Sequence, residues 1–145
     1  MQKMVRTLSE LEEEAARFVD TLAPITGATL VTLSGELGAG KTAFTKAVAR
    51  AFGVEDIVNS PTFILEKIYQ LRGETPKFKR LVHIDAYRLE KESDLAPLGF
   101  DELMQNRDNL ILFEWPEKVV DALPEPTVRI SIAVQDDGSR IISYG

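Results

Sequence analysis

The chain has 145 residues, of which 44% are hydrophobic and 28% charged, a formal net charge of −6 and no cysteine. These values predict a single globular domain over residues 1–145, exclude disulfides and thiolate metal sites, and fit a reducing cytoplasm. The acidic balance argues against a direct grip on nucleic acid, and the absence of a long apolar run argues against a membrane span or a signal peptide.

A helix over residues 9–22 is the first predicted element. Ser9 and Glu12 form the pattern of a capping box, in which each side chain bonds the other residue's free N–H group. Apolar residues at helical spacing follow, namely Leu11, Ala15, Phe18, Val19 and Leu22. The β-branched, apolar run at 28–33 then predicts the first strand.

Residues 35–42 read GELGAGKT and match the phosphate-loop pattern G-x-x-x-x-G-K-[ST] completely. The predicted strand precedes this loop and a helix-like run at 43–52 follows it. Glycines let a phosphate chain approach backbone N–H groups, and the start of the helix favours an anion. Lys41 would then reach the β- and γ-phosphates, and the Thr42 hydroxyl would bind Mg²⁺. The dinucleotide fingerprint G-x-G-x-x-G does not occur.

The segment after this helix contains Ser60, Pro61 and Thr62. Proline keeps the preceding residue out of the helical region, so the segment is extended or a loop. It would either meet the γ-phosphate as a switch loop or simply lead into a strand, and spacing favours neither. Strands are predicted at 62–71 and 80–86, and their short connection indicates an antiparallel pair.

The second half of the chain alternates short helical pieces with strands. Helical pieces are expected from Ser93 and Asp94, over 100–106 and over 116–123, and the apolar run 110–113 predicts a buried central strand. Strands at 127–134 and 140–144 flank a hairpin turn at 136–138. The chain is therefore predicted to be α/β, a P-loop NTPase-like three-layer α/β/α fold with a mixed sheet and a C-terminal antiparallel hairpin.

Two carboxylates, Asp85 and Glu114, follow apolar strands. Ligands in open α/β sheets lie beyond such strand ends, so either carboxylate could serve Mg²⁺, hold water or merely cap a helix. Glu114 follows the more apolar strand and is the better candidate for Mg²⁺, but the pattern leaves the division of roles open. His83 shares a face with Asp85 and fits a buried structural histidine better than a general base. Trp115 would pack either on a nucleotide or in the core.

Four blocks, at 35–42, 60–63, 83–89 and 114–115, resemble the bacterial TsaE family in order and spacing. The resemblance implies a small ATPase that uses ATP and Mg²⁺ in tRNA threonylcarbamoyladenosine biosynthesis, at adenosine 37. Its implied partners are the catalytic threonylcarbamoyl-transferase subunit and its dimerising companion, which would hold most of the tRNA.

The resemblance also implies roles for single residues. Glu114 would bind Mg²⁺ with Thr42, Asp85 would lie near the γ-phosphate, and the strands from residue 127 onward would carry no site. Ala43 departs from the family, many members of which have a second hydroxyl residue there. The expected catalytic residues are Lys41, Asp85 and Glu114. The expected nucleotide-binding residues, in the loop and outside it, are Thr7, Glu36, Leu37, Gly38, Ala39, Gly40, Lys41, Thr42, Ser60, Thr62, Asp85 and Trp115.

Two other functions fit a phosphate loop. A small-molecule or nucleoside kinase would need an acceptor pocket and an arginine-rich lid, and neither is evident in the sequence. A nucleotide-dependent binding module would bind ATP without useful turnover. A GTPase is disfavoured because the guanine motif N-K-x-D is absent.

Overall fold

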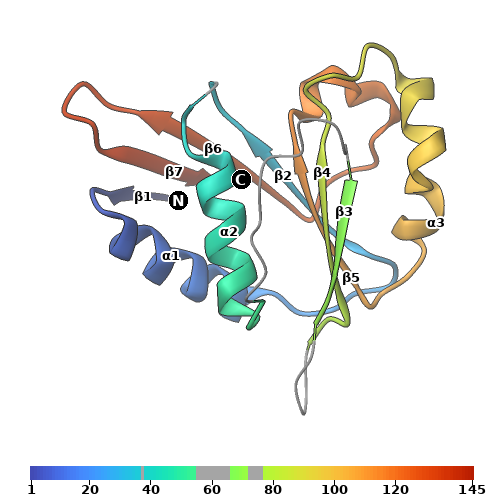
Figure 1. Ribbon diagram of the computed structural model, residues 1–145, viewed down its shortest axis with the longest axis horizontal. Helices are drawn as coiled ribbons and strands as arrows, with labels where there is room; N and C mark the ends of the chain where they lie inside the picture. Colours follow the sequence, from blue (N-terminus) through green and yellow to red (C-terminus); the bar gives the residue numbers. More distant parts are fainter. Residues whose placement is uncertain (37, 55–65, 72–76) are drawn as a thin grey trace.

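The computed structural model describes residues 1–36, 38–54, 66–71 and 77–145 (Figure 1). None of the helices in these ranges is both long enough and apolar enough to cross a membrane. The strands are β1 (Gln2–Val5), β2 (Thr29–Ser34), β3 (Glu66–Gln70), β4 (Arg80–Asp85), β5 (Asn109–Glu114), β6 (Val128–Val134) and β7 (Arg140–Tyr144). The α-helices are α1 (Leu8–Thr21), α2 (Lys41–Ala51) and α3 (Phe100–Met104), and short 3₁₀ helices span Glu92–Leu98, Pro116–Lys118 and Val120–Ala122.

All seven strands form one sheet in the order β1-β7-β6-β2-β5-β4-β3. The four central strands, β6, β2, β5 and β4, run parallel, whereas β1–β7, β7–β6 and β3–β4 are antiparallel pairs. The predicted mixed sheet, the C-terminal hairpin and the antiparallel β3–β4 pair are therefore confirmed. Every residue of β5 is buried, as expected of a strand between two parallel neighbours.

Helices cover both faces of the sheet. On one face, Phe18 of α1 and Phe44 of α2 pack with Val31 and Leu33 of β2. On the other face, Phe100 at the start of α3 packs edge-on against Phe113 of β5, with ring centres 5.7 Å apart. Figure 1 shows α1 and α2 side by side and α3 at the opposite end of the view. The expected three-layer α/β/α arrangement is present.

The N-terminus differs from the sequence-based expectation in two ways. Strand β1 was not predicted; it pairs with β7, so that the two chain ends lie side by side (Figure 1). Helix α1 is capped by Thr7, whose hydroxyl accepts a hydrogen bond from the Glu10 amide at 3.1 Å, and Ser9 lies inside the helix. The capping box predicted at Ser9 is therefore wrong by two residues. The earlier start allows Glu10 to bond the Arg6 amide as well, at 3.2 Å.

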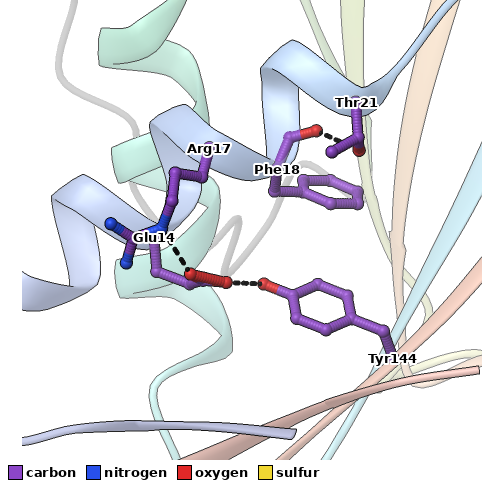
Figure 2. Close-up of polar contacts among 5 residues, drawn as sticks. All are labelled: Glu14, Arg17, Phe18, Thr21 and Tyr144. Carbon is purple, nitrogen blue, oxygen red and sulfur yellow. Dashed lines mark hydrogen bonds and ion pairs between the residues drawn. The ribbon is translucent and has the colours of Figure 1, made fainter. Parts of the chain in front are cut away.

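A polar cluster fastens the last strand to the first helix (Figure 2). The Tyr144 hydroxyl donates to the Glu14 carboxylate at 2.8 Å, and Arg17 pairs with the same carboxylate at 3.0 Å. The Tyr144 ring stacks on Phe18, with centres 5.6 Å apart. Burial, with help from the bond to Glu14, raises the pKa of the Tyr144 hydroxyl well above its usual range. Glu14 is thus a buried side chain that joins α1 to β7.

Candidate nucleotide site

The phosphate loop joins β2 to α2, and two of its glycines are required by their surroundings. Gly40 precedes α2 with φ 111°, a left-handed conformation that disfavours side chains. A Cβ on Gly35 would lie 2.6 Å from the Ile132 carbonyl oxygen of β6. Since Gly40 has no side chain, it cannot cap the helix, and the first N–H groups of α2 stay available for an anion.

Lys41 is buried at the start of α2. Its ammonium donates to the carbonyls of Gly35 and Glu36, the latter at 3.2 Å, and lies 3.8 Å from the centre of the Trp115 ring. Burial lowers the pKa of Lys41, and the nearby charges of Glu114, Glu117 and Asp85 oppose that shift. The ammonium is thus held at the loop in a place where its charge is costly and where an anion would stabilise it.

Asp85 and Glu114 lie side by side at the carboxyl ends of β4 and β5, as neighbours in the parallel register. Both side chains are buried, and a buried carboxylate requires partners. Asp85 accepts a hydrogen bond from the Tyr87 amide at 2.9 Å. Glu114 is in contact with Nε2 of His83, which has no exposed surface. His83 is therefore a buried partner of Glu114, in line with the structural role favoured by the sequence.

Trp115 follows Glu114 and has an unusual backbone conformation. Its φ is 61°, the one positive φ among the non-glycine residues that the structure describes. Such a conformation is rare for a large side chain and persists only when its surroundings enforce it. The Trp115 amide donates to the Leu33 carbonyl at 3.2 Å, and its ring packs on Tyr87 with centres 5.0 Å apart. These contacts hold the indole ring of Trp115 next to the ammonium of Lys41.

Four of the residues expected at the site come together, namely Lys41, Asp85, Glu114 and Trp115. Thr42 follows Lys41 in sequence and is half-buried in the first turn of α2. Thr7 caps α1, and its hydroxyl bonds Glu10. Leu37, Ser60 and Thr62 lie outside the described residues, so their expected contacts stay predictions.

Two further side chains lie close to the loop and were not expected there. Glu117 lies in the turn after Trp115, and its negative charge acts to raise the pKa of Lys41. Arg140 of β7 donates a hydrogen bond to the Ala39 carbonyl at 2.7 Å, across 101 positions of sequence. No local motif marks an arginine of the C-terminal hairpin as a neighbour of the phosphate loop, so sequence patterns alone could not have found this contact.

The oxygen donors at this site fit Mg²⁺. Thr42 and Glu114 offer a hydroxyl and a carboxylate, both hard ligands, from the loop and the adjacent strand. Within the described ranges no group of three or more histidine, cysteine or acidic residues is arranged to hold a metal ion. Mg²⁺ is commonly bound by one or two protein oxygens together with substrate phosphates and water, which is the kind of site that these two residues could make.

Comparisons with known proteins give a consistent result. A family model described as "Threonylcarbamoyl adenosine biosynthesis protein TsaE" matches residues 5–142. The tRNA threonylcarbamoyladenosine biosynthesis protein TsaE of Bacillus subtilis is 41% identical over 115 residues, covering 79% of this chain and 68% of the relative. The protein of the same name from Rickettsia bellii is 33% identical over 141 residues, covering 97% and 91%. The crystal structure of YdiB from Bacillus subtilis superimposes with a TM-score of 0.78 at 28% identity, covering 99% of this chain and 83% of that one.

Proposed function

Because the chain belongs to the TsaE family of threonylcarbamoyl adenosine biosynthesis proteins, we propose that it is the subunit that binds and hydrolyses ATP in that pathway. The observation that carries the proposal is the meeting of Lys41, Asp85 and Glu114 beside the phosphate loop. We further propose that residues 1–145 form one ATPase domain acting in the cytoplasm.

In the proposed complex, the phosphates of ATP lie on the loop N–H groups at the start of α2. The Lys41 ammonium leaves the carbonyls of Gly35 and Glu36 and binds the β- and γ-phosphates, which regain for it the stabilisation that burial removes. Trp115 lies within reach of the same ammonium and would border the nucleotide.

Hydrolysis would need a positioned water. We assign this role to Asp85, which lies at the end of β4 next to Glu114, and we assign Glu114 and Thr42 to Mg²⁺. When bound, Mg²⁺ would neutralise charge on the β- and γ-phosphates. The water oxygen would attack the γ-phosphorus in line, and the bond to the bridging oxygen would break, so that ADP and phosphate are the products. Lys41 and the loop N–H groups would stabilise the charge that develops.

The partners proposed for this subunit are the catalytic threonylcarbamoyl-transferase subunit and its dimerising companion. The chain's net charge of −6 suits a subunit that leaves most of the tRNA contact to its partners. The Ser60–Thr62 segment would sense the γ-phosphate, and the segment around Thr7 would face the adenine.

The nature of the acceptor distinguishes an ATPase from a kinase. The purified chain is incubated with ATP labelled on the γ-phosphate, with and without nucleosides and small alcohols, and the labelled products are separated. An ATPase releases free phosphate at a rate that these acceptors do not change. A phosphorylated acceptor that forms faster than free phosphate would refute the proposal in favour of a kinase.

A further inference from the structure

We propose that Arg140 of the C-terminal hairpin is a positioning residue, which holds the phosphate loop in its nucleotide-binding shape. The inference rests on the proposed function for its effect on ATP, but the contact itself does not. The resemblance to the TsaE family implied no site in the strands after residue 127, so this role for β7 is new.

The contact between Arg140 and the loop is short and closely fitted. Nε of Arg140 donates to the Ala39 carbonyl at 2.7 Å. A Cβ on Gly40 would lie 3.2 Å from the same Nε and 3.3 Å from Cδ of Arg140. Gly40 therefore leaves room for the arginine as well as for its own positive φ. Ala39 is 1% exposed, so the residue that accepts this hydrogen bond is buried.

The hydrogen bond fixes the direction of a whole peptide group. The structure contains no cis peptide bond among its described residues, so the Ala39 carbonyl and the Gly40 N–H point in opposite directions across one planar unit. Once Arg140 holds the carbonyl on its own side, the Gly40 N–H must point away from the hairpin. Phosphate loops bind their ligand through such N–H groups, and a planar guanidinium is a rigid donor with which to orient one.

The hairpin can hold the loop in place because the hairpin is itself fixed by its neighbours. Arg140 pairs through its backbone with Val134 of β6 on one side and with Val5 of β1 on the other. Four residues further on, Tyr144 is bonded to Glu14 of α1 and stacked on Phe18 (Figure 2). Arg140 is thus fixed within a seven-stranded sheet, and its side chain ties a glycine-rich loop to that sheet.

A second arginine of the hairpin provides a matched control. Arg129 of β6 pairs with Glu125 at 2.8 Å and is 55% exposed, and none of its described contacts involves the loop. Removing Arg129 therefore lowers the charge of the hairpin by the same amount as removing Arg140. A general attraction between the arginines of the hairpin and phosphates would be weakened by both changes.

The test compares wild type with R140M, R140K and R129M. Calorimetry gives the Kd of ADP, melting gives the stability, and NMR gives the exchange rate of the Ala39 amide, which donates to the Glu36 carbonyl at 3.0 Å. We expect R140M to raise the Kd about ten-fold and to speed exchange at Ala39, R140K to restore binding to within about three-fold, and R129M to change the Kd less than about two-fold. If R140M does not fold, R140L replaces it, since a leucine also lacks a donor for the Ala39 carbonyl.

Three results would overturn the proposal. The first is a folded R140M or R140L that binds ADP as tightly as wild type. The second is an equal loss of affinity in R140M and R129M. The third is an exchange rate of the Ala39 amide that is equal in R140M and R129M. A wild-type chain that binds no ADP would contradict the proposed function, and the exchange rates alone would then test the role of Arg140. Faster exchange in R140M than in R129M would support that role.

Discussion

The ammonium of Lys41 lies 3.8 Å from the centre of the Trp115 ring, so the lysine expected to bind phosphate rests on the residue that follows Glu114. A cation over an indole face is attracted by the ring quadrupole. Trp115 is the only tryptophan in the chain, which makes this contact observable.

Binding of ATP is therefore expected to change the intrinsic fluorescence of the protein. Phosphates draw the ammonium of Lys41 away from the indole, and the nucleotide replaces it as the neighbour of the ring. Titration with ATP should give a saturable change with the same Kd as calorimetry. Heat of binding without any change in the emission of Trp115 would show that the lysine stays on the ring.

Replacing Lys41 with methionine should separate binding from stability. We expect K41M to weaken ATP binding by at least about ten-fold, because a charge-assisted bond to phosphate is lost. The lowered pKa of Lys41 means that its charged form is disfavoured in the folded state, so K41M should not lower the melting temperature of the nucleotide-free protein. A large drop in melting temperature would contradict this account of the buried ammonium.

His83 should matter for Mg²⁺ through Glu114. Removing a side chain that orients a metal-binding carboxylate typically costs about 10–100-fold in metal affinity. We expect H83L to weaken the binding of Mn²⁺, used as a paramagnetic substitute for Mg²⁺, in the presence of ADP. H83Q keeps a donor near the position of Nε2 and should restore much of the affinity. Equal Mn²⁺ affinity in H83L and wild type would show that Glu114 needs no orientation by His83.

Asp85 and Glu114 should differ in the parameter that they control. E114Q is expected to raise the Mg²⁺ concentration at half-maximal ATP hydrolysis, since it removes a charged ligand. D85N should lower kcat by about 100-fold or more with little change in the Mg²⁺ requirement, because a water-positioning group acts in the transition state. Metal titrations of both variants check this division, and the opposite pattern would exchange the two roles.

The bond between Tyr144 and Glu14 should appear as alkaline sensitivity. The pKa of Tyr144 is higher in the folded state than its unfolded value near 10, so its stabilising contribution is complete below pH 10 and declines as the pH rises above that value. Urea unfolding from pH 7 to 11 should show this decline in wild type, and Y144F should lack it. At pH 7, Y144F should cost about 1–2 kcal/mol. Y87F, at an exposed tyrosine, is the control and should leave the pH profile of wild type unchanged.

Local patterns in the sequence were enough to predict much of this molecule. The loop at 35–42 and the strand-end positions of Asp85 and Glu114 are encoded by motif and periodicity, and parallel strands bring such ends together. Contacts between distant segments were not predictable in this way. Strand β1 is short and depends on pairing with β7, and Arg140 reaches Ala39 only because the hairpin folds back beside the loop. Ser9 was the predicted cap of the first helix, whereas Thr7 is the observed one.

The most direct test of the central claim is phosphate release from ATP, measured for this chain alone and with the threonylcarbamoyl-transferase subunit and its companion added. We expect slow release from the chain alone, a clear acceleration by the two partners, and loss of that acceleration in K41M and D85N. Release that the partners do not change, or that survives in both variants, would contradict the claim that this chain is the ATP-hydrolysing subunit of the pathway.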